Sequence, residues 1–320
     1  MKKRLSCFLL AALLLCCCGC AARPTPDDER LQVVCSLFPY YDFVRAIGGE
    51  YVSATLLIPA GRETHSFEPT PLDVITVSRA DVFVYNGGES EYWVDEILGA
   101  AGESIGSVVR MMDHVDALEE EIADGMEGHG HDHEHHHEEG GHDEISYDEH
   151  IWTSPVGAKE LCRAICDALC AADSDHADLY RANLDAYLLQ LDALDAAFTD
   201  VVSQAQRCTL VFGDRFPLLY LCKTYGLEYS AAFHGCAGDT EPSLATLKYL
   251  IDKVRDEAIP VVYTIELSSR KVALAIAEST DAAVAQLHSC QNVTKEEFDG
   301  GATYLSLMWQ NAEALKEGLS

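Results

Sequence analysis

The stretch Asp175–Gln206 reads DHADLYRANLDAYLLQLDALDAAFTDVVSQAQ and contains neither proline nor glycine. Its apolar side chains recur every three or four residues, which is the period of one face of an α-helix. These side chains are Tyr180, Leu184, Tyr187, Leu188, Leu191, Leu194, Phe198, Val201 and Val202. The pattern predicts one amphipathic helix of about 30 residues, or about 45 Å. A helix of this length in mid-chain is a rigid connector, so we expect it to restrict hinge motion between the segments it joins.

On both sides of this helix, short β-branched runs alternate with segments of helical period. Such alternation is typical of α/β domains with parallel sheets. Strands are predicted at Gln32–Phe38, Tyr51–Ile58, Asp81–Tyr85, Thr209–Gly213, Val261–Ile265 and Ala283–His288, and helices at Pro71–Arg79 and Pro155–Ala171. A further helix is expected after Pro242, which suits a first turn, with Thr240 as its cap. The sequence therefore predicts an α/β fold with one parallel sheet in each half.

The N-terminal segment has the pattern of a lipoprotein signal peptide. Three basic residues precede the apolar run Phe8–Cys18, which is too short to span a bilayer. The run ends at Gly19-Cys20-Ala21, so we expect cleavage before Cys20 and acylation of its thiol. An ordinary secretory signal is the alternative. The expected segments are a signal peptide (1–20), a tether (21–30), an N-terminal lobe (31–172), the linking helix (173–206) and a C-terminal lobe (207–320).

Charge and cysteine content exclude some classes of protein. The chain has 53 acidic and 22 basic residues, for a net charge of -31. This surface repels nucleic acid and concentrates cations, although solubility alone also explains it. No cysteine after Cys20 forms a CxxC pair, so a zinc knuckle is not expected. Cys162, Cys166 and Cys170 lie on one stripe of a predicted helix and are expected to face a core.

A histidine-rich loop is predicted at 125–144. Seven histidines fall within fourteen residues: His129, His131, His133, His135, His136, His137 and His142. Neutral imidazole binds zinc, copper and nickel, and the interspersed carboxylates add oxygen ligands. The loop is interpreted as an auxiliary metal-collecting segment with several weak, exchanging sites. A solvated acidic loop and a purification tag are the alternatives.

Four other histidines stand where loops follow predicted strands or precede a helix. They are His65, His150, His234 and His288, whereas His114 and His176 are expected at the surface. Loops at the carboxyl ends of parallel strands are the usual position of ligand sites in such sheets. The four imidazoles are therefore candidates for one metal site.

Four sequence pieces carry a resemblance to a known family. In chain order they are PAGRETHSFEPTPLD (59–73), the histidine-rich loop, DEHIWTSP (148–155) and GDTEPS (238–243). Together they resemble the zinc and manganese ABC-transporter substrate-binding proteins over nearly all of the mature chain. The resemblance implies two similar (β/α)4-like lobes joined by one long rigid helix, with the metal in the cleft between them. It also implies a monomeric, lipid-anchored, extracytoplasmic binding protein without catalysis. Its partners would be a membrane permease, which receives the metal, and a separate ATPase.

The resemblance implies His65 and His150 as ligands from the first lobe. The second lobe departs from the family pattern, because Gly213 replaces a histidine or acid and no acid lies within Gly300–Tyr304. His234 is interpreted as the third ligand and His288 as a substitute for the fourth. Glu266 matches a glutamate common in the family and is either a ligand or a partner of one. Two further carboxylates, Glu68 and Asp148, are expected to orient imidazoles or only to cap helices.

This donor set favours Zn2+ over Mn2+, because imidazoles suit tetrahedral zinc. A manganese- or iron-type binder of the same family is the nearest alternative. A secreted zinc hydrolase with Glu68 or Glu266 as its base, and an adhesin or metal buffer that uses the histidine-rich loop alone, are more distant ones. If His234 and His288 meet at one metal, a Cys236–Cys290 disulfide is expected.

Overall fold

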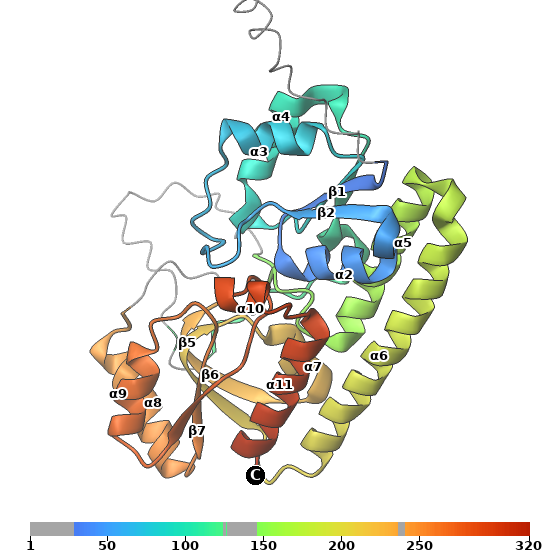
Figure 1. Ribbon diagram of the computed structural model, residues 1–320. Coiled ribbons are helices and arrows are strands. Elements are labelled where there is room, and N and C mark those ends of the chain that lie inside the picture. The colour runs from blue at the N-terminus through green and yellow to red at the C-terminus, as the bar shows by residue number, and fades with distance from the viewer. Residues whose placement is uncertain (1–28, 124–125, 127–145, 236–240) are drawn as a thin grey trace, which may run out of the picture. The chain divides into compact units, whose positions relative to one another are not determined.

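The computed structural model describes residues 29–123, 126, 146–235 and 241–320 (Figure 1). Leu31–Ser320 form one compact unit, and within its described residues the chain folds into two four-stranded parallel sheets. No helix in the described ranges is long and apolar enough to cross a membrane. The expected signal peptide, nearly all of the tether and the seven histidines of the loop lie outside these ranges.

The first sheet has the strand order β2-β1-β3-β4. Its elements are β1 (Leu31–Cys35), α2 (Phe38–Gly48), β2 (Val52–Leu56), α3 (Pro71–Ser78), β3 (Val82–Tyr85), α4 (Trp93–Ala101) and β4 (Ser107–Arg110). The three predicted strands are confirmed, with ends a few residues shorter. Strand β4 was not predicted, because its sequence SVVR is short and buries only Val109.

The second sheet has the order β6-β5-β7-β8 and so repeats the topology of the first. Its elements are β5 (Thr209–Phe216), α7 (Leu219–Tyr225), β6 (Glu228–His234), α8 (Leu244–Asp256), β7 (Val261–Thr264), α9 (Lys271–Glu278), β8 (Ala283–Gln286), α10 (Lys295–Asp299) and α11 (Tyr304–Gly318). Strand β5 runs past its predicted end at Gly213, with an irregular register between Phe212 and Arg215.

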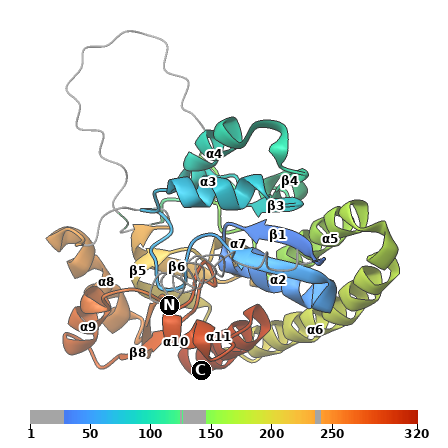
Figure 2. The same ribbon diagram turned by 45° about the horizontal axis from the view of Figure 1, so that its top comes forward.

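The two faces of the second sheet pack against different helices. Alternate residues of a strand point to opposite faces, and Val211 packs with Leu250 of α8 and Ile276 of α9. Its neighbour Phe212 lies in the other cluster, together with Leu315 of α11. Figure 2 shows α8 and α9 together beside the sheet, apart from α11. Each face of β5 is therefore buried, which explains its continuous apolar run.

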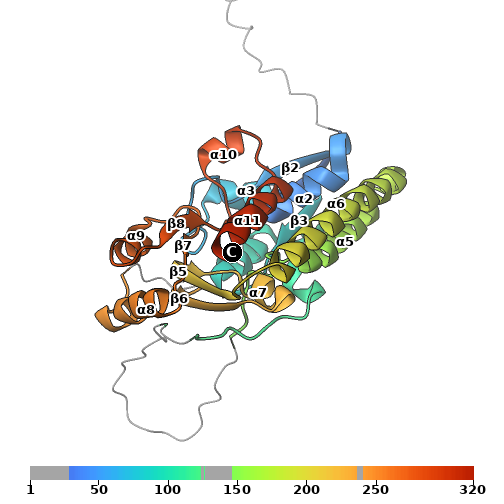
Figure 3. The same cartoon turned by 90° about the horizontal axis from the view of Figure 1, so that it is seen from below.

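The predicted long helix is confirmed as α6 (Ala177–Ser203), preceded by a 3-10 turn at Ser174–His176. Helix α5 (Pro155–Ala172) runs beside it, as Figures 1 and 3 both show. Helix α6 also packs against α2 and α11, which belong to different halves of the chain. Further 3-10 turns lie at Gly49–Tyr51, Glu89–Glu91, Gly102–Ser104 and Met111–His114.

Helix α8 begins later than the sequence indicated. The hydroxyl of Ser243 accepts from the backbone N–H of Thr246, so Ser243 is the cap and Pro242 precedes it. The expectation that Pro242 lies in the first turn is wrong, because the hydroxyl directly before the apolar stripe is in better position to cap. Thr240 lies outside the described residues.

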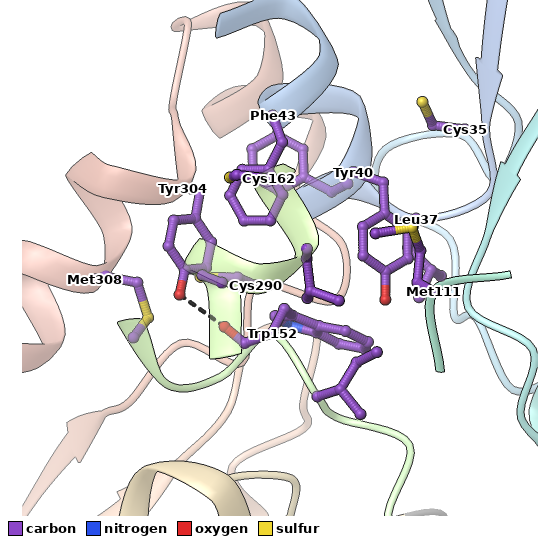
Figure 4. Close-up of a cluster of buried hydrophobic side chains, with 14 of the residues drawn as sticks. Cys35, Leu37, Tyr40, Phe43, Met111, Trp152, Cys162, Cys290, Tyr304 and Met308 are labelled. Carbon is purple, nitrogen blue, oxygen red and sulfur yellow. Dashed lines mark hydrogen bonds between the residues drawn. The ribbon is translucent and has the colours of Figure 1, made fainter. Parts of the chain in front are cut away.

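One hydrophobic core joins the two halves (Figure 4). Trp152 donates its indole N–H to the carbonyl of Ser289 across the junction, at 2.7 Å. Tyr304 of α11 donates its hydroxyl to the carbonyl of Trp152 at 2.7 Å, and its ring packs edge-on against Phe43 at 4.8 Å. The backbone N–H of Tyr304 reaches Asp42 of α2 at 2.8 Å. The halves are therefore held together by shared apolar packing as well as by α6.

The cysteines of α5 face this core as predicted. Cys162 and Cys166 are buried, and Cys170 is half-buried. The thiols of Cys166 and Cys170 lie 3.9 Å apart. Cys290 is a free, buried thiol, so the expected Cys236–Cys290 disulfide is not borne out; Cys236 itself lies outside the described residues.

Candidate metal site

His65 and His150 lie beside one another. His65 is in the loop after β2, which ends at Thr70, where a capping box with Asp73 starts α3. His150 lies in the segment before α5. Their ring centroids are 6.2 Å apart and the planes are inclined by 59°. Two imidazoles on one tetrahedral zinc have centroids about 5 Å apart, given Zn–N bonds of about 2.0–2.1 Å. A shift of about 1 Å would bring this pair to that spacing.

His150 is held with one ring nitrogen unused. Its backbone N–H and its Nδ1 lie 2.8 and 3.2 Å from Oδ1 of Asp148. Nδ1 is assigned as the donor to this carboxylate, which leaves a lone pair on Nε2. That atom is buried and has no hydrogen-bond partner within the described part of the chain. Because an unpaired buried polar atom costs about 1–3 kcal/mol, a bound cation would relieve this cost.

The two imidazoles differ in basicity. Burial, then the charges of His150 and Arg215, lower the pKa of His65 to about 4. His65 is therefore neutral at pH 7, with a lone pair for a metal. Burial also lowers the pKa of His150, but the carboxylate of Asp148 outweighs burial and raises it above its usual value. A metal must therefore compete with protons for His150 up to a higher pH than for an ordinary imidazole.

The second half of the chain borders His65. Nε2 of Gln291 lies 3.5 Å from Nε2 of His65. Arg215 at the end of β5 donates to Glu63 at 2.8 Å, two residues before His65. A cavity of about 20 Å³ beside these residues is lined by Arg62, Glu63, Thr64, Arg215, Ile265, Glu266, Leu267, Gln291 and Asn292. Polar groups from both halves thus converge on the loop that carries His65.

His234 is the last residue of β6, and the strand end lies directly on His150. A Cβ added at Gly235 would be 2.9 Å from Cε1 of His150, so the close approach requires glycine. Nδ1 of His234 lies 2.9 Å from Oε1 of Glu120, and the imidazole is buried. Three of the four candidate histidines therefore gather around one region.

His288 belongs to a different network. Its Nδ1 accepts from the backbone N–H of Cys290 at 2.9 Å, and Asn311 binds both its backbone N–H and its carbonyl. Burial lowers the pKa of His288, but Glu266 outweighs burial and raises it well above the usual value. Whether neutral with Nδ1 as an acceptor or protonated, the ring keeps a proton on Nε2. His288 thus offers a metal no lone pair there.

Glu266 holds the loop after β8. Its Oε2 accepts from the backbone N–H of Ser289 at 2.7 Å, and its Oε1 accepts from the Ser289 hydroxyl. It also lies 3.5 Å from Nδ1 of His288. In this arrangement, no three histidine, cysteine or acidic side chains of the described residues are close enough to hold one ion. The site is open and would need to contract around a metal.

The carboxylates expected to orient imidazoles are placed differently. Asp148 contacts His150, whereas Glu68 is exposed and contacts no imidazole in the interactions of the described residues. The carboxylate near His65 is Glu63 instead. Glu120, which reaches His234 from 114 positions away, was missed because no sequence signal links the two.

The two remaining histidines lie away from this region. His114 is exposed as expected. His176 is at the surface, with 38% of its side chain exposed, while its ring stacks on Tyr51 at 3.9 Å and its Nδ1 lies 2.7 Å from Asp173. The ring covers part of Tyr51 and so becomes half-buried.

Comparison with known proteins supplies the family. The chain matches the family of the periplasmic zinc-uptake complex component A, ZnuA, over residues 33–318. It belongs to this family. The high-affinity zinc uptake system protein ZnuA of Bacillus subtilis is 31% identical to the chain over 328 residues, covering 99% of this chain and 98% of that protein. The resemblance predicted from the sequence motifs is therefore confirmed.

A further relative comes from Streptococcus pneumoniae. Its zinc-binding lipoprotein AdcA is 32% identical over 312 residues, covering 97% of this chain but 60% of AdcA. The zinc-bound ZnuA-like domain of AdcA superposes with a TM-score of 0.73 at 28% identity, covering 91% of this chain and 99% of the domain. The chain thus spans about three fifths of AdcA and nearly all of the Bacillus ZnuA.

Proposed function

We propose that this chain captures a zinc ion between its two halves and delivers it to a membrane permease, as the substrate-binding component of an ABC importer. The observation that carries the proposal is the buried, unpartnered Nε2 of His150, beside His65 and under the end of β6. The names of the Bacillus ZnuA and of the zinc-bound AdcA domain support zinc as the ion. Binding without catalysis is part of the proposal.

His65, His150 and His234 are the proposed ligands. Three neutral imidazoles and one further oxygen donor fit tetrahedral zinc better than manganese. His288 and Glu266, which were candidate ligands, act in this proposal through the loop Ser289–Gln291 that reaches His65. The net charge of -31 raises the cation concentration near the surface.

The remaining parts of the proposal rest on segments outside the described residues. Acylation of Cys20 anchors the chain on the outer side of the cell membrane. The histidine-rich loop collects metal. The permease receives the ion, a separate ATPase drives transport, and the binding protein works as a monomer.

Zinc and manganese titrations of the chelator-treated chain from about residue 23 test this proposal. One tight zinc site is expected above several weaker ones. The double variant His65→Ala and His150→Ala should lose the tight site alone, whereas His114→Ala, at an exposed histidine, should keep it. Tight binding that survives in the double variant would move the site out of the cleft. A preference for manganese over zinc would contradict the ion.

A further inference from the structure

A carboxylate from outside both sheets reaches the candidate site. Glu120 lies in the extended segment that follows β4, and its side chain is 14% exposed. Its Oε1 lies 2.9 Å from Nδ1 of His234, which belongs to the other half of the chain. Glu120 therefore links a proposed ligand of the second half to a segment of the first half.

Glu120 lies in a segment that is fixed by backbone hydrogen bonds. Two arms, residues 118–121 and 146–148, are paired by an antiparallel bridge between Glu119 and Tyr147. Backbone hydrogen bonds of 2.9 Å run from Glu120 to Ser146 and from Asp148 to Leu118. The Tyr220 hydroxyl ties both arms to the second half, accepting from Leu118 at 3.0 Å and donating to Asp148 at 2.9 Å. The backbone that carries Glu120 is thus held in place from both halves.

Each of the two arms places a carboxylate against Nδ1 of one imidazole. Asp148 on one arm accepts from His150, and Glu120 on the other accepts from His234. An imidazole that donates Nδ1–H to a carboxylate has a fixed orientation and tautomer, and its Nε2 becomes a better ligand. In both rings Nδ1 is therefore occupied by a carboxylate, and Nε2 is the nitrogen that would bind a metal.

The charge balance of the site also supports a role for Glu120. Three neutral imidazoles leave the two positive charges of Zn2+ uncompensated, and a buried charge without compensation is costly. Asp148 accepts from His150 and Glu120 from His234, whereas the carboxylate of Glu63 accepts from the backbone N–H of His65. Glu63 does not supply this charge, because Arg215 already pairs with it at 2.8 Å.

We propose that Glu120 is a positioning residue of the zinc site, which holds His234 ready to bind the ion and supplies, with Asp148, the compensating charge. The inference rests on the proposed function, because it takes zinc as the ion and His234 as a ligand. It adds a residue from outside both sheets and ties the C-terminal ligand to an N-terminal arm.

Zinc competition titrations of Glu120→Gln test the inference, with Glu119→Gln as a matched control. Gln keeps the size and an accepting oxygen but removes the charge. The expected loss of zinc affinity is about 10- to 100-fold for E120Q, as for other residues that orient metal ligands. E119Q should bind as the wild type, because Glu119 is exposed and contributes its backbone to the bridge. Equal affinities of E120Q and E119Q would overturn the inference.

Two further measurements separate positioning from stability. In the His234→Ala background E120Q should cost no further affinity; an undiminished loss there would show that Glu120 does not act through His234. Glu120→Asp keeps the charge but withdraws the oxygen, so the absorption bands of bound Co2+ should shift; an unchanged spectrum would also overturn the inference. If wild-type protein lacks the tight site, the proposed function fails instead.

Discussion

The ends of β6 and β8 present two histidines in similar settings. His234 and His288 are both buried, and each has a glutamate nearby. His234 is the last residue of β6, and His288 lies two residues after β8 of the same sheet. They differ in the group that faces Nδ1. A carboxylate of Glu120 faces His234, whereas the backbone N–H of Cys290 faces His288. The partner of Nδ1, more than the position along the strand, decides whether Nε2 can bind a metal.

Alanine substitution at the two strand ends should give the largest contrast. His234→Ala removes a proposed ligand, so zinc affinity should fall by more than the roughly 10- to 100-fold typical of an orienting residue. His288→Ala should leave zinc affinity nearly unchanged and lower the melting temperature, because it removes a buried ring that accepts from the backbone N–H of Cys290. Competition titrations and thermal unfolding of the metal-free proteins measure both. The reverse ranking would make His288 the ligand.

Asp148→Asn tests the same rule at His150. Loss of the carboxylate should weaken zinc binding by about 10- to 100-fold. Asp148 raises the pKa of His150, so wild-type affinity should fall as pH drops through that raised value, because protons compete with zinc. In D148N the fall should move to lower pH. Calorimetry in buffers of different ionisation enthalpy should show less proton release at neutral pH, and unchanged proton release would contradict this account.

Asp42→Asn probes the apolar junction without touching an imidazole of the site. Burial raises the pKa of Asp42 from 3.8 to about 6. The folded state therefore holds this proton more tightly than the unfolded state, and the free energy of unfolding falls as pH rises from 3.8 to about 6. Asn carries no charge at any pH and so avoids the cost of burying an ionised carboxylate. D42N should therefore be more stable than wild type by about 1–3 kcal/mol at pH 8 and little different at pH 4. Thermal unfolding at both pH values measures this, and zinc affinity should not change.

Much of the fold could be predicted from periodicity. The α6 helix has nine apolar side chains at helical spacing and no breaker, so its tertiary contacts agree with its local preference. The buried strands were visible as β-branched runs. Strand β4 was not, because it is short and half-exposed. The continuation of β5 beyond Gly213 depends on packing across the sheet, which a local pattern does not carry.

The site could be predicted only in part. His65 and His150 stand in distinctive motifs, and the structure places their rings 6.2 Å apart. The different roles proposed for His234 and His288 depend on which atoms face Nδ1, and the fold determines these atoms. Glu120 is 114 positions from His234, and no periodicity connects an acid in a loop with a histidine at a strand end.

The shared core around Trp152 and Tyr304 sets a limit on how an ion can leave. Swinging the halves apart would expose both rings, which bury about 150–250 Å² each, at a cost of about 8 kcal/mol or more. A state that high in free energy is populated about once in a million molecules. Spontaneous escape by wholesale opening is therefore rare, and the residence time of the ion follows the smaller excursions of the loops that carry His65 and Gln291. A protein that takes the ion needs to displace only those loops.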